Sequence, residues 1–182
     1  MASARWRTFS TREDLAAELA ATVADRLRAA IEEKGGATLA VSGGTTPALF
    51  FAALSHKDLD WTKVIVTLVD ERFVPPSSER SNERLVREKL LTNEARLARF
   101  VGLYSDAADV DEAARRAEAG VALLGSTLDV VVLGMGTDGH TASFFPDAPN
   151  LAALTDVAQK RRVLAVHAPS GGEPRLTLTM PL

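Results

Sequence analysis

The 182-residue chain contains no cysteine, which excludes disulfide-stapled folds, thiolate metal sites and cysteine nucleophiles. It also lacks a basic excess: 21 Lys and Arg against 24 Asp and Glu give a net charge of −3. Proteins that follow nucleic-acid phosphates need a basic surface, so we expect no nucleic-acid partner. No apolar run approaches the roughly 20 residues that cross a bilayer, and residues 1–9 lack the apolar segment of a signal peptide. We therefore expect a cytoplasmic protein without a membrane partner.

Composition and length indicate one folded domain. Hydrophobic residues make up 46% and charged residues 25% of the chain, as in ordinary globular proteins. The length suffices for one sizeable core, and the sequence shows no repeat, low-complexity segment or domain linker. We expect a single domain over residues 1–182, either monomeric or homodimeric.

Helical and strand patterns alternate along the chain. A capping-box sequence at residues 10–13 precedes apolar residues that recur every four positions, which predicts a long helix ending at residues 35–36. Apolar strands are predicted at residues 38–42, 64–69, 128–133, 163–167 and 176–180, and further helices from residue 47, over 81–91 and over 109–124. Buried strands that alternate with helices are typical of an α/β fold with a mainly parallel sheet and helices on both faces.

Ligands of such sheets bind beyond the carboxyl ends of the strands, so the segments that follow the strands are the first candidates for a site. Ser42–Pro47 follows the first strand and contains two glycines and two threonines. Backbone N–H groups, hydroxyls and a helix N-terminus together could cradle a phosphate. The other interpretation is a plain strand-to-helix turn.

Three charged residues, Asp70, Glu71 and Arg72, follow the apolar strand at 64–69. Charges next to a buried strand are costly unless they pair or face a solvent-filled cleft. The segment is either a solvated turn with a Glu71–Arg72 pair, or an arginine aimed at an anion and oriented by the neighbouring carboxylate. Asn82 either belongs to the same cleft or begins the next helix.

The glycine-rich segment Gly134–Ser143 ends the strand at 128–133 and carries His140 close to Asp138. Histidine is suited to proton transfer near neutral pH, and a neighbouring aspartate can fix its tautomer. A lone histidine is more often structural, but this cluster at a strand end favours catalysis. No His, Asp or Glu residues have metal-ligand spacing, so we expect no metal site.

Arg175 ends a loop that begins at residue 169 and starts the last predicted strand. The loop is either a surface turn or the source of a second cation for an anionic ligand. The two remaining histidines, His56 and His167, are interpreted as structural, because one lies at a helix end and the other in an apolar strand.

Taken together, these segments resemble the 6-phosphogluconolactonase family. The resemblance runs through residues 42–47, 70–75, 81–82, 134–146 and 175–179. The related glucosamine-6-phosphate deaminases share the glycine-rich loop and the Asp-Gly-His core but differ after Glu71 and at residues 143–146. The resemblance implies a Rossmann-like three-layer α/β sandwich and hydrolysis of 6-phosphogluconolactone to 6-phosphogluconate in the pentose phosphate pathway. It implies no metal and no organic cofactor.

The resemblance also implies catalytic roles for four residues. His140, oriented by Asp138, would act as general base on the attacking water. Arg72, held in place by Glu71, would stabilise the oxyanion of the tetrahedral intermediate.

Substrate binding is assigned to a second set of residues on the same basis. Gly43, Gly44, Thr45 and Arg175 would hold the phosphate, and Ser42, Asn82 and Gly136 are further candidates for contact with the substrate.

Two other functions remain open. One is an isomerase-deaminase acting on an amino-sugar phosphate, for which Asp70 is the only candidate base. The other is a domain that senses a sugar phosphate without chemistry, although such domains usually carry a DNA-reading segment and none precedes the first helix. Members of the resembled family continue past the strand at 175–179, so we expect this chain to lack their C-terminal βα portion.

Overall fold

Four parallel strands form the central sheet of the computed structural model, which describes residues 4–167 and 172–181. They are β1 (Ala37–Val41), β2 (Val64–Leu68), β4 (Arg99–Val101) and β5 (Val130–Val132), in the order β4-β2-β1-β5. All five residues of β1 are buried, as expected for an apolar strand at the centre of a parallel sheet. β4 is three residues long and was not predicted from the sequence.

The last two predicted strands form a second sheet. β6 (Val163–Val166) and β7 (Arg175–Leu178) pair antiparallel, and β7 also pairs antiparallel with the short strand β3 (Asp70–Arg72). Only Val69 separates β3 from β2, so the chain passes directly from the parallel sheet into the second one. Thr177 alternates with the apolar residues of β7, and such alternation is typical of antiparallel strands.

Residues 4–167 and 172–181 contain five α-helices and three short 3₁₀ helices besides the strands. The α-helices are α1 (Arg12–Lys34), α2 (Ala48–Ser55), α3 (Asn82–Lys89), α4 (Val110–Val121) and α5 (Leu151–Thr155) within the described residues. The 3₁₀ helices are Trp61–Lys63, Asn93–Leu97 and Ala122–Leu124. The Thr11 side chain caps α1 by accepting a hydrogen bond from the Asp14 backbone N–H, and Gly35 ends the helix with a φ of 83°.

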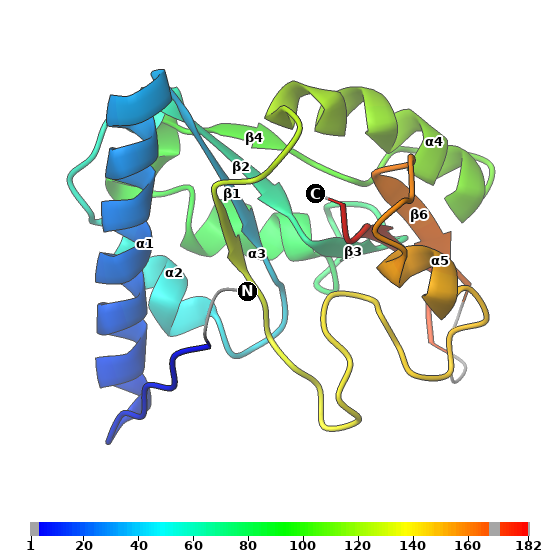
Figure 1. Ribbon diagram of the computed structural model, residues 1–182, viewed down its shortest axis with the longest axis horizontal. Coiled ribbons are helices and arrows are strands. Elements are labelled where there is room, and N and C mark those ends of the chain that lie inside the picture. Colours follow the sequence, from blue (N-terminus) through cyan, green and yellow to red (C-terminus); the bar gives the residue numbers. More distant parts are fainter. Residues whose placement is uncertain (1–3, 168–171, 182) are drawn as a thin grey trace.

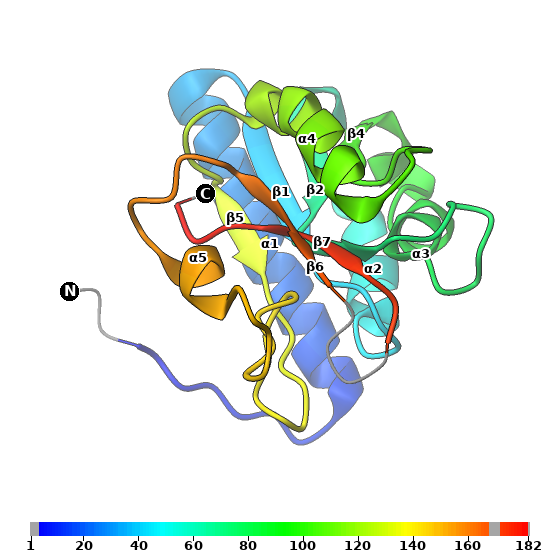
Figure 2. The same cartoon turned by 90° about the vertical axis from the view of Figure 1, so that its right-hand side faces the viewer.

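Helices lie on both sides of the parallel sheet. α1 packs on β1 and β5 and also against α2, whereas α4 packs on β6 and β7 (Figure 1). In Figure 2, α1 lies behind the parallel sheet and α4 in front of it. This arrangement confirms the predicted three-layer α/β architecture. Within residues 4–167 and 172–181, no helix combines the length and the apolar character needed to cross a membrane.

Asp129 ties α1 to the two strands that flank the site. Its Oδ2 accepts hydrogen bonds from the Thr38 backbone N–H at 2.8 Å and from the Thr38 hydroxyl at 2.9 Å. Its Oδ1 lies 2.6 Å from Lys34 Nζ at the end of α1. One carboxylate therefore fixes the starts of β1 and β5 relative to each other.

Replacing Asp129 by alanine should destabilise the fold. The Asp129→Ala variant leaves the Thr38 donors without their acceptor, and we expect a loss of about 2 kcal/mol in the free energy of unfolding. Urea denaturation measures it. The matched control is Asp25→Ala, whose pair with Arg28 is solvent-exposed and whose loss should cost less than about 0.5 kcal/mol. Equal effects of the two substitutions would contradict the anchoring role of Asp129.

Candidate active site

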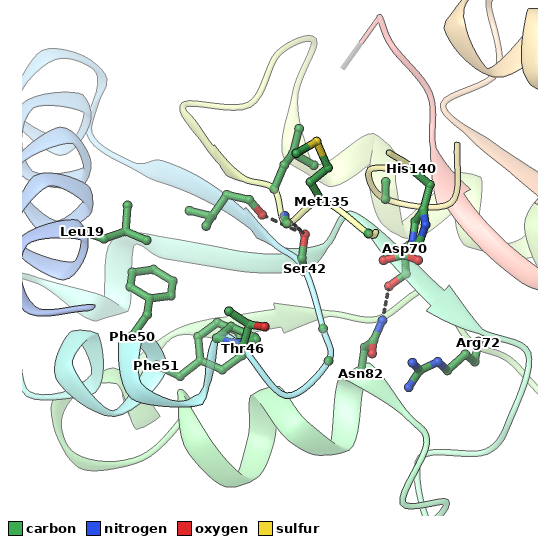
Figure 3. Close-up of a pocket in the computed structure, with 18 of the residues that line it drawn as sticks. Leu19, Ser42, Thr46, Phe50, Phe51, Asp70, Arg72, Asn82, Met135 and His140 are labelled. Carbon is green, nitrogen blue, oxygen red and sulfur yellow. Dashed lines mark hydrogen bonds between the residues drawn. The ribbon is translucent and has the colours of Figure 1, made fainter. Parts of the chain in front are cut away.

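A cavity of about 390 Å³ lies beyond the carboxyl ends of β1 and β5 (Figure 3). Small-molecule sites typically measure about 300–1,000 Å³, so the cavity suits a ligand of that kind. One side is apolar and includes Leu19, Phe50 and Phe51. The polar and glycine residues that line it include Ser42, Gly43, Gly44, Thr46, Asp70, Arg72, Asn82, Gly136, His140 and Arg175. Most of the residues predicted from the sequence are thus brought together.

The loop after β1 approaches α3 closely. A Cβ atom on Gly43 would lie 1.8 Å from Asn82 Oδ1, so only glycine fits at this position. Asn82 is buried, lines the cavity and is the first residue of α3, so both interpretations of it hold. Its Nδ2 donates a hydrogen bond of 2.9 Å to the Asp70 carbonyl oxygen and thereby joins α3 to β3.

Ser42 bridges two loops. Its hydroxyl donates to the Val132 carbonyl oxygen at 3.1 Å and accepts from the Gly134 N–H at 3.1 Å. Because its only hydroxyl hydrogen is used in this bridge, Ser42 supports the cavity wall. Among the described residues that line the cavity, Thr46 is present and the predicted Thr45 is not.

Glu71 does not hold the Arg72 guanidinium, contrary to the expectation from the sequence. The segment is a strand, in which successive side chains point to opposite faces, so Asp70 and Arg72 face the cavity while Glu71 points away from it. The buried Glu71 carboxylate accepts four hydrogen bonds of 2.7–3.0 Å from the backbone N–H groups of Arg72, Asn82 and Glu83 and from the Ser81 hydroxyl. Burial raises the pKa of Glu71, and these four donors oppose that rise.

Asp70 is a buried carboxylate inside the cavity wall. Its Oδ2 accepts a hydrogen bond of 2.6 Å from the Ser143 hydroxyl and lies 3.9 Å from Arg175 Nη1. Burial raises the pKa of Asp70, while Ser143, Arg175 and Arg72 act in the opposite direction. Ser143 was not among the residues predicted for the site, although it lies in the glycine-rich segment.

Arg72 and Arg175 face each other as a cross-strand pair of β3 and β7. Like charges directly opposite in a sheet destabilise it. The Nε atoms of both are buried and have no hydrogen-bond partner among residues 4–167 and 172–181, whereas Arg72 Nη1 donates to the Arg80 carbonyl oxygen at 2.6 Å. Burial lowers the pKa of Arg175. Two guanidinium groups beside one cavity, whose charge the Asp70 carboxylate offsets only in part, are suited to an anionic ligand.

His140 is held by Asp138 at the mouth of the cavity. His140 Nδ1 lies 2.6 Å from Asp138 Oδ1, and the His140 backbone N–H donates to the same oxygen at 3.2 Å. The hydrogen bond from His140 lowers the pKa of Asp138. Because Asp138 occupies Nδ1, the Nε2 atom of His140 is the nitrogen left for a ligand.

A tight turn sets the direction of the His140 ring. The Gly136 N–H donates to the His140 carbonyl oxygen at 2.8 Å, and Gly139 adopts a φ of 88°. A Cβ atom on Gly136 would lie 2.3 Å from His140 Cε1 and 2.6 Å from Asp138 Oδ1. The imidazole therefore packs directly on the backbone at Gly136.

The other histidines have local partners. His56 Nε2 lies 3.1 Å from Asn93 Nδ2, and His167 Nε2 lies 2.9 Å from Asp111 Oδ2. Within the described part of the chain, no three His, Cys, Asp or Glu side chains are grouped so that they could hold a metal ion. In the predicted loop at 169–175, residues 169–171 lie outside the described residues.

Three kinds of comparison with known proteins agree. The model of the family described as glucosamine-6-phosphate isomerases/6-phosphogluconolactonase matches residues 10–182. A 6-phosphogluconolactonase of Mesorhizobium japonicum is 61% identical over 179 residues, which cover 98% of this chain and 75% of that protein. The crystal structure of a 6-phosphogluconolactonase from Shewanella baltica superposes with a TM-score of 0.89 at 41% identity, covering 94% of this chain and 72% of that one.

Replacing Gly136 by alanine should displace the His140 imidazole, because the added methyl group overlaps the ring. We expect the His140 ring signals in a side-chain ¹H–¹⁵N NMR spectrum to shift in Gly136→Ala. Gly134→Ala is the matched control, since a Cβ atom at Gly134 meets no atom within 4 Å. An unchanged His140 spectrum in Gly136→Ala would show that the turn does not set the ring.

Proposed function

The chain belongs to the family of glucosamine-6-phosphate isomerases and 6-phosphogluconolactonases, and we propose that it hydrolyses 6-phosphogluconolactone to 6-phosphogluconate. The observation that carries this proposal is the placement of the His140–Asp138 pair and two arginines around one cavity. A phosphorylated lactone requires a base for water, a group that stabilises an oxyanion, and a cation for the phosphate. Relatives named for this reaction support the choice of substrate.

We assign the proton transfers to His140. Nε2 takes a proton from a water molecule as the water oxygen bonds to the lactone carbonyl carbon. Asp138, which is bound to Nδ1, stabilises the imidazolium that forms. When the bond between this carbon and the ring oxygen breaks, the imidazolium returns the proton to the ring oxygen. The products are a hydroxyl group and a carboxylic acid, which ionises to release a proton to solvent.

The two arginines receive different roles in the proposal. Arg72 stabilises the negative charge on the former carbonyl oxygen of the tetrahedral intermediate. Arg175, together with backbone N–H groups of the loop at Gly43 and Gly44, binds the phosphate and fixes the lactone in register with the base. The placement of both arginines in the wall of the cavity supports this assignment. No step is assigned to a metal ion or an organic cofactor.

Turnover of fresh 6-phosphogluconolactone, followed as proton release in the presence of EDTA and corrected for spontaneous hydrolysis, tests the proposed function. We expect His140→Ala to lower kcat by about 10²–10⁴-fold, the usual contribution of a general base. His167→Gln is the control, because His167 pairs with Asp111 and does not line the cavity among the described residues. No turnover by the unchanged chain, or ammonia release from glucosamine 6-phosphate, would contradict the proposal.

Separate substitutions of the two arginines test whether Arg72 stabilises the oxyanion and Arg175 binds the phosphate. Arg72→Gln should lower kcat by about 10²-fold with a smaller change in KM, as expected when an oxyanion donor is lost. Arg175→Gln should raise KM by about tenfold or more, because it removes a charged contact to the phosphate. Arg84→Gln is the control, since Arg84 pairs with Glu88 at the surface. Identical changes in kcat and KM for both site variants would contradict the separate roles.

A further inference from the structure

Phe145 follows the glycine-rich segment Gly134–Ser143 by two residues, and the proposed function gives it no role. Its ring centroid lies 4.3 Å from that of His140, with the two ring planes inclined by 32°. Phe145 is half-buried and is not among the described residues that line the cavity. It therefore contacts the base from outside the space that the substrate occupies.

The same ring also contacts the phosphate-binding cation. Arg175 Cζ lies 5.6 Å from the centroid of the Phe145 ring, within the range of a cation–π contact. His140 lies in the loop after β5, and Arg175 lies at the start of β7 in the other sheet. One aromatic side chain thus touches two functional groups that come from different sheets.

The backbone around Phe145 is itself fixed. Two residues earlier, the buried Ser143 hydroxyl donates to the buried Asp70 carboxylate at 2.6 Å, which attaches the segment to β3. The Phe145 carbonyl oxygen accepts a hydrogen bond of 3.0 Å from the Ala148 N–H. The ring packs beside a small apolar cluster of Ala148, Leu154 and Val166. These backbone and apolar contacts together fix the orientation of the Phe145 ring.

We infer that Phe145 is a positioning residue, which sets the His140 imidazole and the Arg175 guanidinium relative to each other. The inference rests on the proposed lactone hydrolysis. Asp138 fixes one edge of the imidazole, and the Phe145 ring limits rotation of the imidazole about that hydrogen bond. Because a displacement of about 1 Å can cost on the order of 10²-fold in rate, a ring that fixes both groups affects both kcat and KM.

The ring acts here as an aromatic surface and not only as apolar volume. The imidazolium formed during catalysis is a cation, and the face of an aromatic ring attracts a cation. Leucine fills a comparable space without such a face, whereas tyrosine keeps it. The two substitutions therefore separate packing from the aromatic contact.

Kinetics of Phe145→Leu, Phe145→Tyr and Phe144→Leu test the inference. In Phe145→Leu we expect kcat to fall about tenfold and KM to rise several-fold, because base and phosphate contact are both displaced. Phe145→Tyr should stay within about twofold of the unchanged chain. Phe144 packs beside the same apolar cluster, and no ring contact joins it to His140 among the described residues, so Phe144→Leu should also stay within about twofold.

NMR gives a readout that does not depend on turnover. The ring current of Phe145 should shift the His140 Hε1 resonance upfield in the unchanged chain, and Phe145→Leu should remove that shift. Absence of the shift in the unchanged chain overturns the inference even if the variants fail to fold. Unaltered kcat and KM in a folded Phe145→Leu variant overturn it as well. Absence of lactone turnover in the unchanged chain contradicts the proposed function, while the resonance still tests the contact.

Discussion

The buried carboxylate of Glu71 holds the strand that carries Asp70 and Arg72 against the helix that carries Asn82. Its four hydrogen bonds join the backbone of β3 to the first turn of α3 and to the hydroxyl that caps this helix. Since Asp70 and Arg72 precede and follow Glu71, their side chains must face the opposite way, into the cavity. The polar wall of the site is therefore a consequence of a contact made on its far side.

Two like charges lie directly opposite each other on neighbouring strands at the site, an arrangement that destabilises a sheet. Two arginines face each other across β3 and β7, and one carboxylate, Asp70, lies close to Arg175. The Asp70 carboxylate offsets part of this repulsion. The hydrogen bond from the Ser143 hydroxyl in turn offsets part of the cost of burying that carboxylate. Such a balance leaves positive charge in the cavity before any ligand arrives, so an anion binds to groups that are already in place.

Much of this arrangement could be predicted from the sequence, because the signals are local. The apolar strands, the long first helix and the three glycine-rich or charged strand ends follow from composition and spacing, and the strand-end rule places them at one edge of the sheet. The pairing of β6 and β7 in a separate sheet depends on partners distant in sequence, and spacing alone does not determine it. The role of Glu71 does not follow from the sequence unless residues 70–72 are recognised as a strand, because only the alternation of a strand separates Glu71 from Arg72. Ser143 and Phe145 gave no signal of their own, since a hydroxyl and a ring acquire a role only through the groups that they meet in space.

Successive side chains of β7 point to opposite faces of the sheet. The face on which Arg175 lies therefore depends on whether the number of residues between it and the paired part of the strand is odd or even. Deleting or inserting one residue in β7 ahead of Thr177 would turn the guanidinium to the other face of the sheet, whereas a change of two residues would preserve its face and move it by about 7 Å along β3. A change in the length of the loop that precedes β7 does not change the face on which Arg175 lies. Natural or designed variation in length should therefore be tolerated before β7 and rejected within it, even though both changes are equally small.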